Sequence, residues 1–174
     1  TYYPQIRDAA HTACVHTFGS LAITQPDALS AIKDSANVSC NGGYNGSATV
    51  TVSGGTSPYT YIWTGGVSTT NVASTLIAGT YTVTVRDAHS CEITRTFNIT
   101  EPTALAATKD SVNVSCNGGN NGSATVTVSG GTTPYTYIWT GGVSTTNVAS
   151  TLTAGTYTVT VRDAHSCEIT RTFN

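Results

Sequence analysis

The sequence predicts an all-β protein made of tandem β-sandwich domains, and three observations support this prediction. Residues 27–98 and 103–174 align without a gap, 76 positions apart, and differ at only seven positions. Within each repeat, small or apolar residues alternate with polar ones, which is the pattern of strands buried on one face. Clusters of glycine and asparagine separate these segments, as expected of turns. A near-identical duplication adds length and contact points, whereas a catalytic centre needs one asymmetric group of residues.

The alternation places the strands of the first repeat in order. It is clearest over 47–52, 59–63 and 81–85, where threonines alternate with apolar residues. Threonine favours strands and faces solvent without carrying charge. The expected core residues are Val50, Val52, Tyr61, Trp63, Tyr81, Val83 and Val85. Seven short strands are expected near 28–33, 36–40, 47–53, 58–64, 68–73, 80–86 and 91–99.

The residues before Tyr81 favour an immunoglobulin-like sandwich. Residues 76–81, Leu-Ile-Ala-Gly-Thr-Tyr, resemble the approach to the tyrosine corner of immunoglobulin-like domains. Tyr81 and its counterpart Tyr157 are therefore candidates for this corner. The fold class predicted from the sequence is thus a tandem array of immunoglobulin-like β-sandwich domains.

The phase of the repeat divides the chain into three regions. These are the C-terminal two strands of a preceding repeat (1–26), a full repeat (27–102), and a second repeat lacking the end of its last strand (103–174). Asn174 aligns with Asn98, so the second repeat has no counterpart of Ile99. Ile23-Thr24-Gln25-Pro26 matches the Ile-Thr-Glu-Pro of 99–102, which marks 1–26 as a degenerate copy of the end of the unit. Two strands do not fold alone in water, so these residues are expected to belong to a further domain.

The five cysteines leave two disulfide pairings to compare. One lies within each repeat, Cys40–Cys91 and Cys116–Cys167, and the other bridges repeats, Cys14–Cys40 and Cys91–Cys116. If seven strands alternate in direction, Cys40 ends the second and Cys91 begins the seventh, so both lie at the N-terminal pole. Cys91 and Cys116 would then be a whole domain apart, roughly 30 Å, whereas bridged Cα atoms lie within about 7 Å. We therefore predict the within-repeat bonds, with Cys14 left unpaired.

Reduced structural thiols are the simplest alternative to these bonds. Metal ligation is less favoured, because closely spaced Cys/His clusters are missing from the sequence. Closing a loop of this size contributes about 4 kcal/mol in the chain-entropy model, which would matter for so small a core. Disulfides indicate an oxidising compartment outside the cytoplasm.

Composition and motifs exclude several classes of function. Charged residues make up 9% of the chain and the net charge is −2, which gives no basic footprint for nucleic acid and no polybasic membrane patch. No apolar run approaches the ~20 residues of a transmembrane helix. His89 and His165 follow an aspartate in a turn, which is weak support for a metal site. We expect no catalytic residues and no cofactor, because neither a nucleophile elbow nor a phosphate loop is present.

Longer strings of the sequence resemble one known family. VSCNGGYNGSATVTVSGGTSPYTYIWTGG, followed by LIAGTYTVTVRDAHSC and ITEP, resembles the SprB repeat of very large cell-surface adhesins of Bacteroidetes. The resemblance implies export by type IX secretion, display on the outer membrane and, in some members, gliding motility. Asp34-Ser35-Ala36 and Asp110-Ser111-Val112 also resemble the O-glycosylation signal of such exported proteins, so Ser35 and Ser111 are candidate sites in an exposed turn.

The expected function is that of a non-enzymatic, disulfide-stapled stalk in an extracellular adhesin or filament. Its partners would be neighbouring repeats of the same chain and surface polysaccharide or other cells, with no direct membrane insertion in this segment. One alternative is a carbohydrate-binding accessory module of a secreted enzyme, with Tyr59, Tyr61 and Trp63 as a stacking platform. The other is a self-assembling fibre subunit, in which 1–26 completes a neighbour's sheet.

Overall fold

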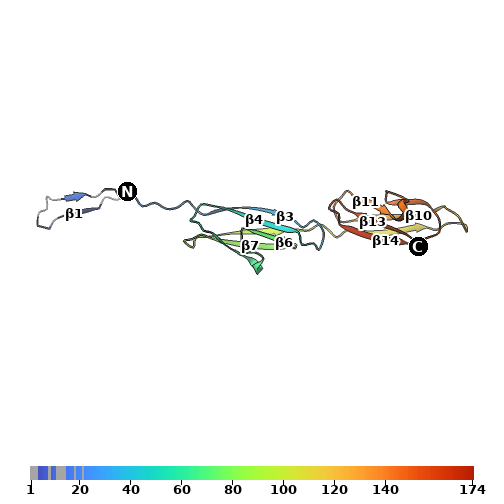
Figure 1. Cartoon of the computed structure of the whole chain (residues 1–174), viewed down its shortest axis with the longest axis horizontal. Helices are drawn as coiled ribbons and strands as arrows, with labels where there is room; N and C mark the ends of the chain where they lie inside the picture. Colours follow the sequence, from blue (N-terminus) through green and yellow to red (C-terminus); the bar gives the residue numbers. More distant parts are fainter. Residues whose placement is uncertain (1–3, 8, 11–14, 18, 21) are drawn as a thin grey trace.

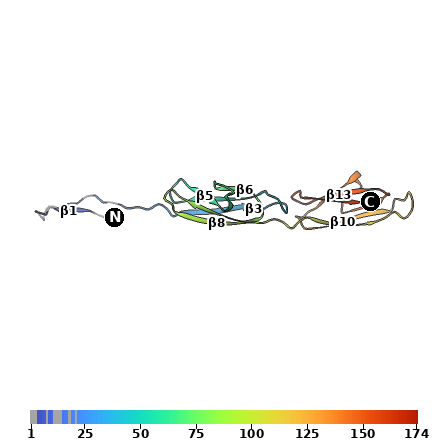
Figure 2. The same cartoon turned by 90° about the horizontal axis from the view of Figure 1, so that it is seen from below.

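Figure 1 shows the computed structural model of the chain, which describes residues 4–7, 9–10, 15–17, 19–20 and 22–174. In both views the two long repeats follow one another along the longest axis (Figures 1 and 2). Each repeat is a sandwich of two three-stranded antiparallel sheets. The predicted all-β, tandem immunoglobulin-like fold is confirmed.

The first repeat pairs its strands in the orders β3-β4-β6 and β5-β7-β8. These strands are β3 (Ser30–Ala36), β4 (Gly46–Ser53), β5 (Thr60–Trp63), β6 (Val72–Leu76), β7 (Gly79–Arg86) and β8 (Glu92–Ile99). A short 3-10 turn, η1 (Thr64–Gly66), starts the crossing from β5 to the other sheet at β6. This interleaving of two sheets along the chain is typical of immunoglobulin-like sandwiches.

The second repeat has the same topology, with the orders β12-β10-β9 and β11-β13-β14. Its elements are β9 (Ala106–Val112), β10 (Gly122–Ser129), β11 (Thr136–Trp139), η2 (Thr140–Gly142), β12 (Val148–Leu152), β13 (Tyr157–Arg162) and β14 (Glu168–Phe173). Two of these strands are shorter than their counterparts: β13 begins at Tyr157 whereas β7 begins at Gly79, and β14 ends at Phe173 whereas β8 ends at Ile99.

The strand count is where the sequence prediction is wrong. In place of the two strands expected at 28–33 and 36–40 there is one strand, β3, which runs through the expected turn and pairs with β4 from Ser30 to Ala36. Residues 37–40 form no strand. Asp34-Ser35, whose residue types favour turns, lies inside this strand and faces solvent. Turn-favouring residues are tolerated inside β3 because β3 is the edge strand of its sheet, and charged side chains are common on edge strands. Each repeat therefore has six strands.

The core of each repeat lies between its two sheets. In the first repeat Val50, Val83 and Val85 are fully buried and Trp63 is 3% exposed, as predicted. The predicted core residues Val52, Tyr61 and Tyr81 are only partly buried and pack against its edge. The core also contains residues that the alternation did not single out: Ala31, Val38, Ala48, Ala73, Leu76, Phe97 and Ile99.

The two poles of the first repeat are defined by contacts between loops. At the N-terminal pole, Gly55 N donates to Asp27 O (2.8 Å) and Thr56 N donates to Asp87 Oδ2 (2.9 Å). At the C-terminal pole, Val38 N donates to Thr100 O (2.9 Å). The chain thus enters one pole and leaves the other, as a tandem array requires.

The N-terminal region contains β1 (Gln5–Arg7) and β2 (Val15–Thr17), which form a two-stranded antiparallel sheet. Their assignment to a preceding repeat stays a prediction. Cys14 lies outside the described residues, so its predicted unpaired state is not decided. Residues 22–29 form no strand, and the Ile23 side chain is 75% exposed.

Candidate functional site: the junction between repeats

A disulfide joins the two repeats. Cys40, in the loop after β3, is bonded to Cys167, in the loop before β14, with a Cα–Cα distance of 5.8 Å. Cys91 and Cys116 are free and exposed. The junction therefore has two covalent connections, the peptide linker and this bond.

The predicted within-repeat bonds, Cys40–Cys91 and Cys116–Cys167, are wrong. The error follows from the strand count, because the single strand β3 in place of the first two expected strands puts Cys40 at the opposite end of the domain. Cys40 lies at the C-terminal pole, where Gly42 N donates to the linker residue Glu101. Cys91 lies at the N-terminal pole, where its N–H donates to Asp87 Oδ1 (2.8 Å). With seven strands Cys40 and Cys91 would share a pole, whereas with six they lie at opposite poles of the repeat.

The first half of the linker is bound to the first repeat. Thr100 N donates to Asn37 Oδ1 (3.0 Å). The Glu101 carboxylate accepts from Asn41 Nδ2 (2.9 Å) and from Gly42 N (2.7 Å), and Asn41 Nδ2 also reaches Pro102 O (3.1 Å). These bonds hold the linker against the same loop that carries Cys40.

The second half of the linker is bound to the second repeat. Gly131 N donates to Thr103 O (2.9 Å). Gly130 has a φ of +69° and lies so close to the linker that a Cβ there would be 2.0 Å from Ala104 O. Only glycine fits both this conformation and this approach. Pro102 O is thus bound to the first repeat and Thr103 O to the second, so the linker passes from one repeat to the other at the Pro102–Thr103 peptide bond.

A buried aspartate holds the loop that carries Cys167. Asp163 is 5% exposed, and its Oδ1 accepts from His165 N and Cys167 N, both at 2.9 Å. Its Oδ2 accepts from Thr132 N (2.9 Å). Asp87 makes the same three contacts around Cys91. The carboxylate thus fixes the backbone position of each of these cysteines.

The same contacts set the charge state of this aspartate. Burial, the largest influence, would raise the pKa of Asp163, but the three backbone N–H donors and the nearby His165 together hold the pKa below its ordinary value. A carboxylate with a lowered pKa stabilises the folded state above its unfolded pKa of about 4, and this contribution is lost as pH falls through the folded pKa.

We expect acid to destabilise the second repeat in a manner that depends on Asp163. Replacing Asp163 with alanine should lower the melting temperature at pH 7 by about 5–10 °C and should flatten the fall in stability below about pH 4. Circular dichroism melts at a series of pH values would measure both effects. Asp110→Asn, which removes an exposed carboxylate from β9, is the control, and an equal effect of the two variants would contradict the role of Asp163.

The other predicted site residues have different surroundings. Tyr81 Oη donates to Ile77 O (3.2 Å) and Tyr157 Oη to Thr153 O (3.2 Å), which is the hydrogen bond that a tyrosine corner requires. Ser35 and Ser111 are exposed, but they lie in strands β3 and β9 and not in the expected turn. Their glycosylation stays a prediction that the intact mass of the secreted chain would check.

The aromatic sugar-stacking platform and the metal site that the sequence offered as alternatives find little support among the described residues. Trp63 is buried and its Nε1 donates to Thr70 O (2.7 Å), so it cannot form an exposed stacking platform. Within the part of the chain that the structure describes, no three His, Cys, Asp or Glu side chains lie together as metal ligands would. Nor does any helix in that part have the length and apolar character needed to cross a membrane.

Comparison with known proteins identifies the repeat. The family model of the SprB repeat matches twice, at residues 32–68 and 108–144, which run from β3 to the loop after β5 and from β9 to the loop after β11. The chain carries two SprB repeats. This repeat belongs to cell-surface adhesins that are generally non-catalytic, and the disulfide fits an extracellular location.

Other comparisons add little to the SprB assignment. No curated protein matches the chain. A solved chain from work on the structural basis for Dscam isoform specificity is similar at 16% identity and a TM-score of 0.31, covering 92% of this chain. This chain spans 50% of that one, and a likeness of this size carries no argument about function.

The residues that build the junction were mostly missed by sequence reasoning. Glu101, Asn41 and Asp163 were not singled out, although each is placed at a linker or turn. A usable signal was present, because Glu101-Pro102 lies two positions after the end of the last strand and Asp163 precedes a cysteine by four positions.

Proposed function

We propose that the two SprB repeats form a load-bearing spacer in the stalk of a cell-surface adhesin or extracellular filament. The observation that supports this role most directly is the double covalent connection at the junction, Cys40–Cys167 together with a linker bound on both sides. Export by type IX secretion, outer-membrane display, and binding to surface polysaccharide or other cells are part of the same proposal, and they rest on the family alone.

The disulfide determines how tension would travel through the spacer. Force applied to the two ends of the chain reaches Cys40 along β3 and leaves Cys167 along β14, because the bond is the shorter covalent route. The loop between these cysteines, which are 127 positions apart, contains most of both cores. Most of each repeat is therefore shielded from extension while the bond is intact.

Single-molecule pulling on the full chain tests this role. With the bond intact, the released length should be short, since only residues outside the Cys40–Cys167 loop can extend. Reduction should add about 440 Å of extendable chain, at roughly 3.5 Å per residue. Cys91→Ser is the matched control, because it removes an exposed free thiol and should leave the released length unchanged.

Three results would contradict the spacer role as proposed. Equal released lengths with and without reductant would show that the bond carries no load. A gain of only about 50 residues per repeat, at the same ~3.5 Å each, would instead indicate bonds within the repeats. Soft extension without distinct unfolding steps would also exclude a rigid spacer.

A further inference from the structure

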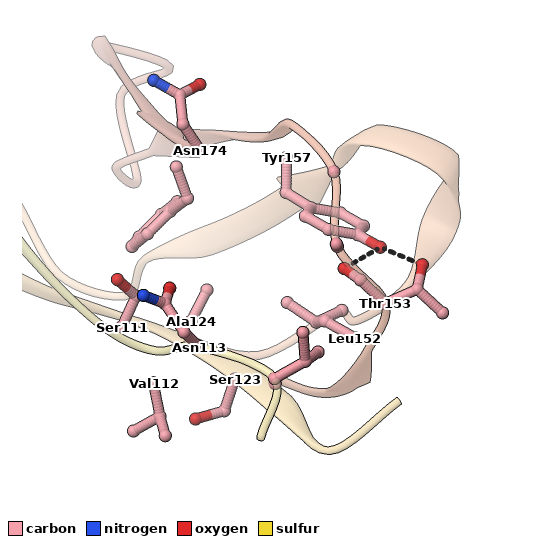
Figure 3. Close-up of a pocket in the computed structure, with 14 residues that line it drawn as sticks. Ser111, Val112, Asn113, Ser123, Ala124, Leu152, Thr153, Tyr157 and Asn174 are labelled. Atoms are coloured by element: carbon pink, nitrogen blue, oxygen red, sulfur yellow. Dashed lines mark hydrogen bonds between the residues drawn. The ribbon is translucent and has the colours of Figure 1, made fainter. Parts of the chain in front are cut away.

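Each repeat has one side where the edge strands of its two sheets lie next to each other. In the first repeat these are β3 and β8, and a side chain from each binds a backbone carbonyl of the other. Figure 3 shows the end of the second repeat, where Ser111 of β9 and Asn174 after β14 lie toward one side and Leu152 of β12 lies toward the other. We call the side formed by β3 and β8, and by β9 and β14, the seam of each repeat. An edge strand presents backbone groups to which a strand of another chain can pair.

Two basic side chains cover backbone carbonyls along the seam of the first repeat. Lys33 Nζ donates to Thr96 O (3.0 Å), and Arg95 Nη1 donates to Thr94 O (3.0 Å). Thr94 and Thr96 are two positions apart on β8, so their carbonyls point to the same edge. Arg95 Nε also donates to Ala31 O on β3 (2.8 Å). Three carbonyls that an added strand would use are thus already bonded.

The same two cations belong to the inward face of their strands. Lys33 pairs with Val50 on β4, and Arg95 pairs with Val83 on β7. Paired residues share a face of the sheet, and both valines are fully buried. A strand added at the seam would take these cations out of water, which is costly. Inward-pointing charge on an edge strand is therefore a barrier to strand addition.

The second repeat has the same arrangement. Lys109 Nζ donates to Thr172 O (2.6 Å). Arg171 donates through Nη1 to Thr170 O (2.9 Å) and through Nε to Ala107 O (2.7 Å). Three of the seven positions at which the repeats differ lie on β3, yet both basic residues of the seam are the same in the two repeats. The chain therefore carries two seams that are covered in the same way.

The edges on the opposite side of the first repeat are short and interrupted. β5 and β6 have four and five residues, whereas β3 and β8 have seven and eight. β6 shifts its register against β4, and Thr75 within it has a φ of +55°. Val72 O, at the start of β6, accepts from Ser68 Oγ (2.6 Å) and from Thr70 Oγ1 (3.0 Å). Short length and a bulge both protect an edge strand, so the long edges at the seam are the ones that need basic side chains.

We propose that the seam of one copy is kept from pairing with an edge strand of a second copy by four basic side chains, the seam cations Lys33, Arg95, Lys109 and Arg171. Pairing of two seams would also bring like charges together, because each seam carries two cations. Neighbouring copies therefore stay separate. The inference goes beyond the spacer role, since the spacer concerns tension along one chain and the seam cations control contacts between chains.

Sedimentation velocity and thioflavin T fluorescence of the full chain test the proposal. The background has Cys14, Cys91 and Cys116 replaced by serine, so that disulfides between copies cannot form, and this parent protein should be monomeric. Lys33→Val together with Lys109→Val should strengthen self-association about tenfold or more and raise the thioflavin T signal. The reason is that the two changes uncover a carbonyl and remove an inward charge in each repeat.

Two further pairs of variants separate the seam from charge in general. Arg86→Val with Arg162→Val makes the same change in net charge, but these arginines are exposed and paired with Glu92 and Glu168 away from the seam. This protein should stay monomeric. Lys33→Arg with Lys109→Arg keeps a charged donor at each seam and should also stay monomeric.

Three results would overturn the proposal. The first is a Lys33→Val, Lys109→Val protein that sediments as a monomer, and the second is equal assembly of the Arg86→Val, Arg162→Val protein. The third is assembly by a valine variant whose melting temperature has fallen well below that of the parent, because unfolded chains would then be the associating species. None of these results would affect the pulling experiment, so the two proposals can fail separately.

Discussion

Replacing Cys167 with serine is expected to lower the free energy of unfolding by about 4–5 kcal/mol, because the bond closes a loop of more than a hundred residues. The cysteines that it joins are 127 positions apart. The other two cysteines among residues 22–174, Cys91 and Cys116, are free, so no second disulfide in this part of the chain would compensate for the loss. Denaturant unfolding of the full chain, followed by circular dichroism, would measure the loss. Reductant should lower the stability of the wild-type chain to that of the variant.

Matched controls make this result specific to the pairing. Cys91 and Cys116 are exposed free thiols in the same two loop types, so Cys91→Ser and Cys116→Ser should each change stability by less than about 0.5 kcal/mol. If Cys91→Ser proved as costly as Cys167→Ser, the bonds would lie within the repeats and the junction would be held by the linker alone.

Replacing Trp63 with alanine should cost about 3–5 kcal/mol and should affect the first repeat alone. Trp63 packs on Phe97 with ring centroids 5.5 Å apart, and it is nearly fully buried. The second repeat has its own tryptophan, Trp139, in a separate core. Trp139 fluorescence would therefore report an undisturbed second repeat while circular dichroism reports loss of the first.

The neighbouring residue provides the control for Trp63. Ile62 precedes it on β5, points to the other face of the sheet and is 54% exposed. Ile62→Ala should change stability by about 0.5 kcal/mol or less. Simultaneous loss of both repeats in Trp63→Ala would show that the two cores unfold as one unit.

The sequence predicted the fold class because the information for it is local. Alternation along β4 and β7 is a direct consequence of strand geometry, in which successive side chains point to opposite faces. Trp63 and Val83 are recognisable as core residues for that reason. Phe97 and Ile99 lie in a strand that was also expected, but their burial depends on packing between the sheets, which the alternation does not report.

The junction was not predictable from the same signals. Asp34-Ser35 has the residue types of a turn, and its place in an edge strand follows from solvent on one side of β3, which is a property of the assembled sheet. One strand fewer reverses the pole at which Cys40 lies. The parity of the strand count, and not the spacing of the cysteines, thus decided which pairing was possible.

The Cys40–Cys167 bond also bears on how the chain would survive proteolysis. A single cut at any peptide bond between these two residues gives an N-terminal fragment that contains Cys40 and a C-terminal fragment that contains Cys167. The disulfide still joins the two fragments. The linker between the two repeats lies between Cys40 and Cys167 in the sequence, so a cut there also leaves the two pieces joined. A nicked chain would thus keep its two ends attached, and shedding would require a second lesion.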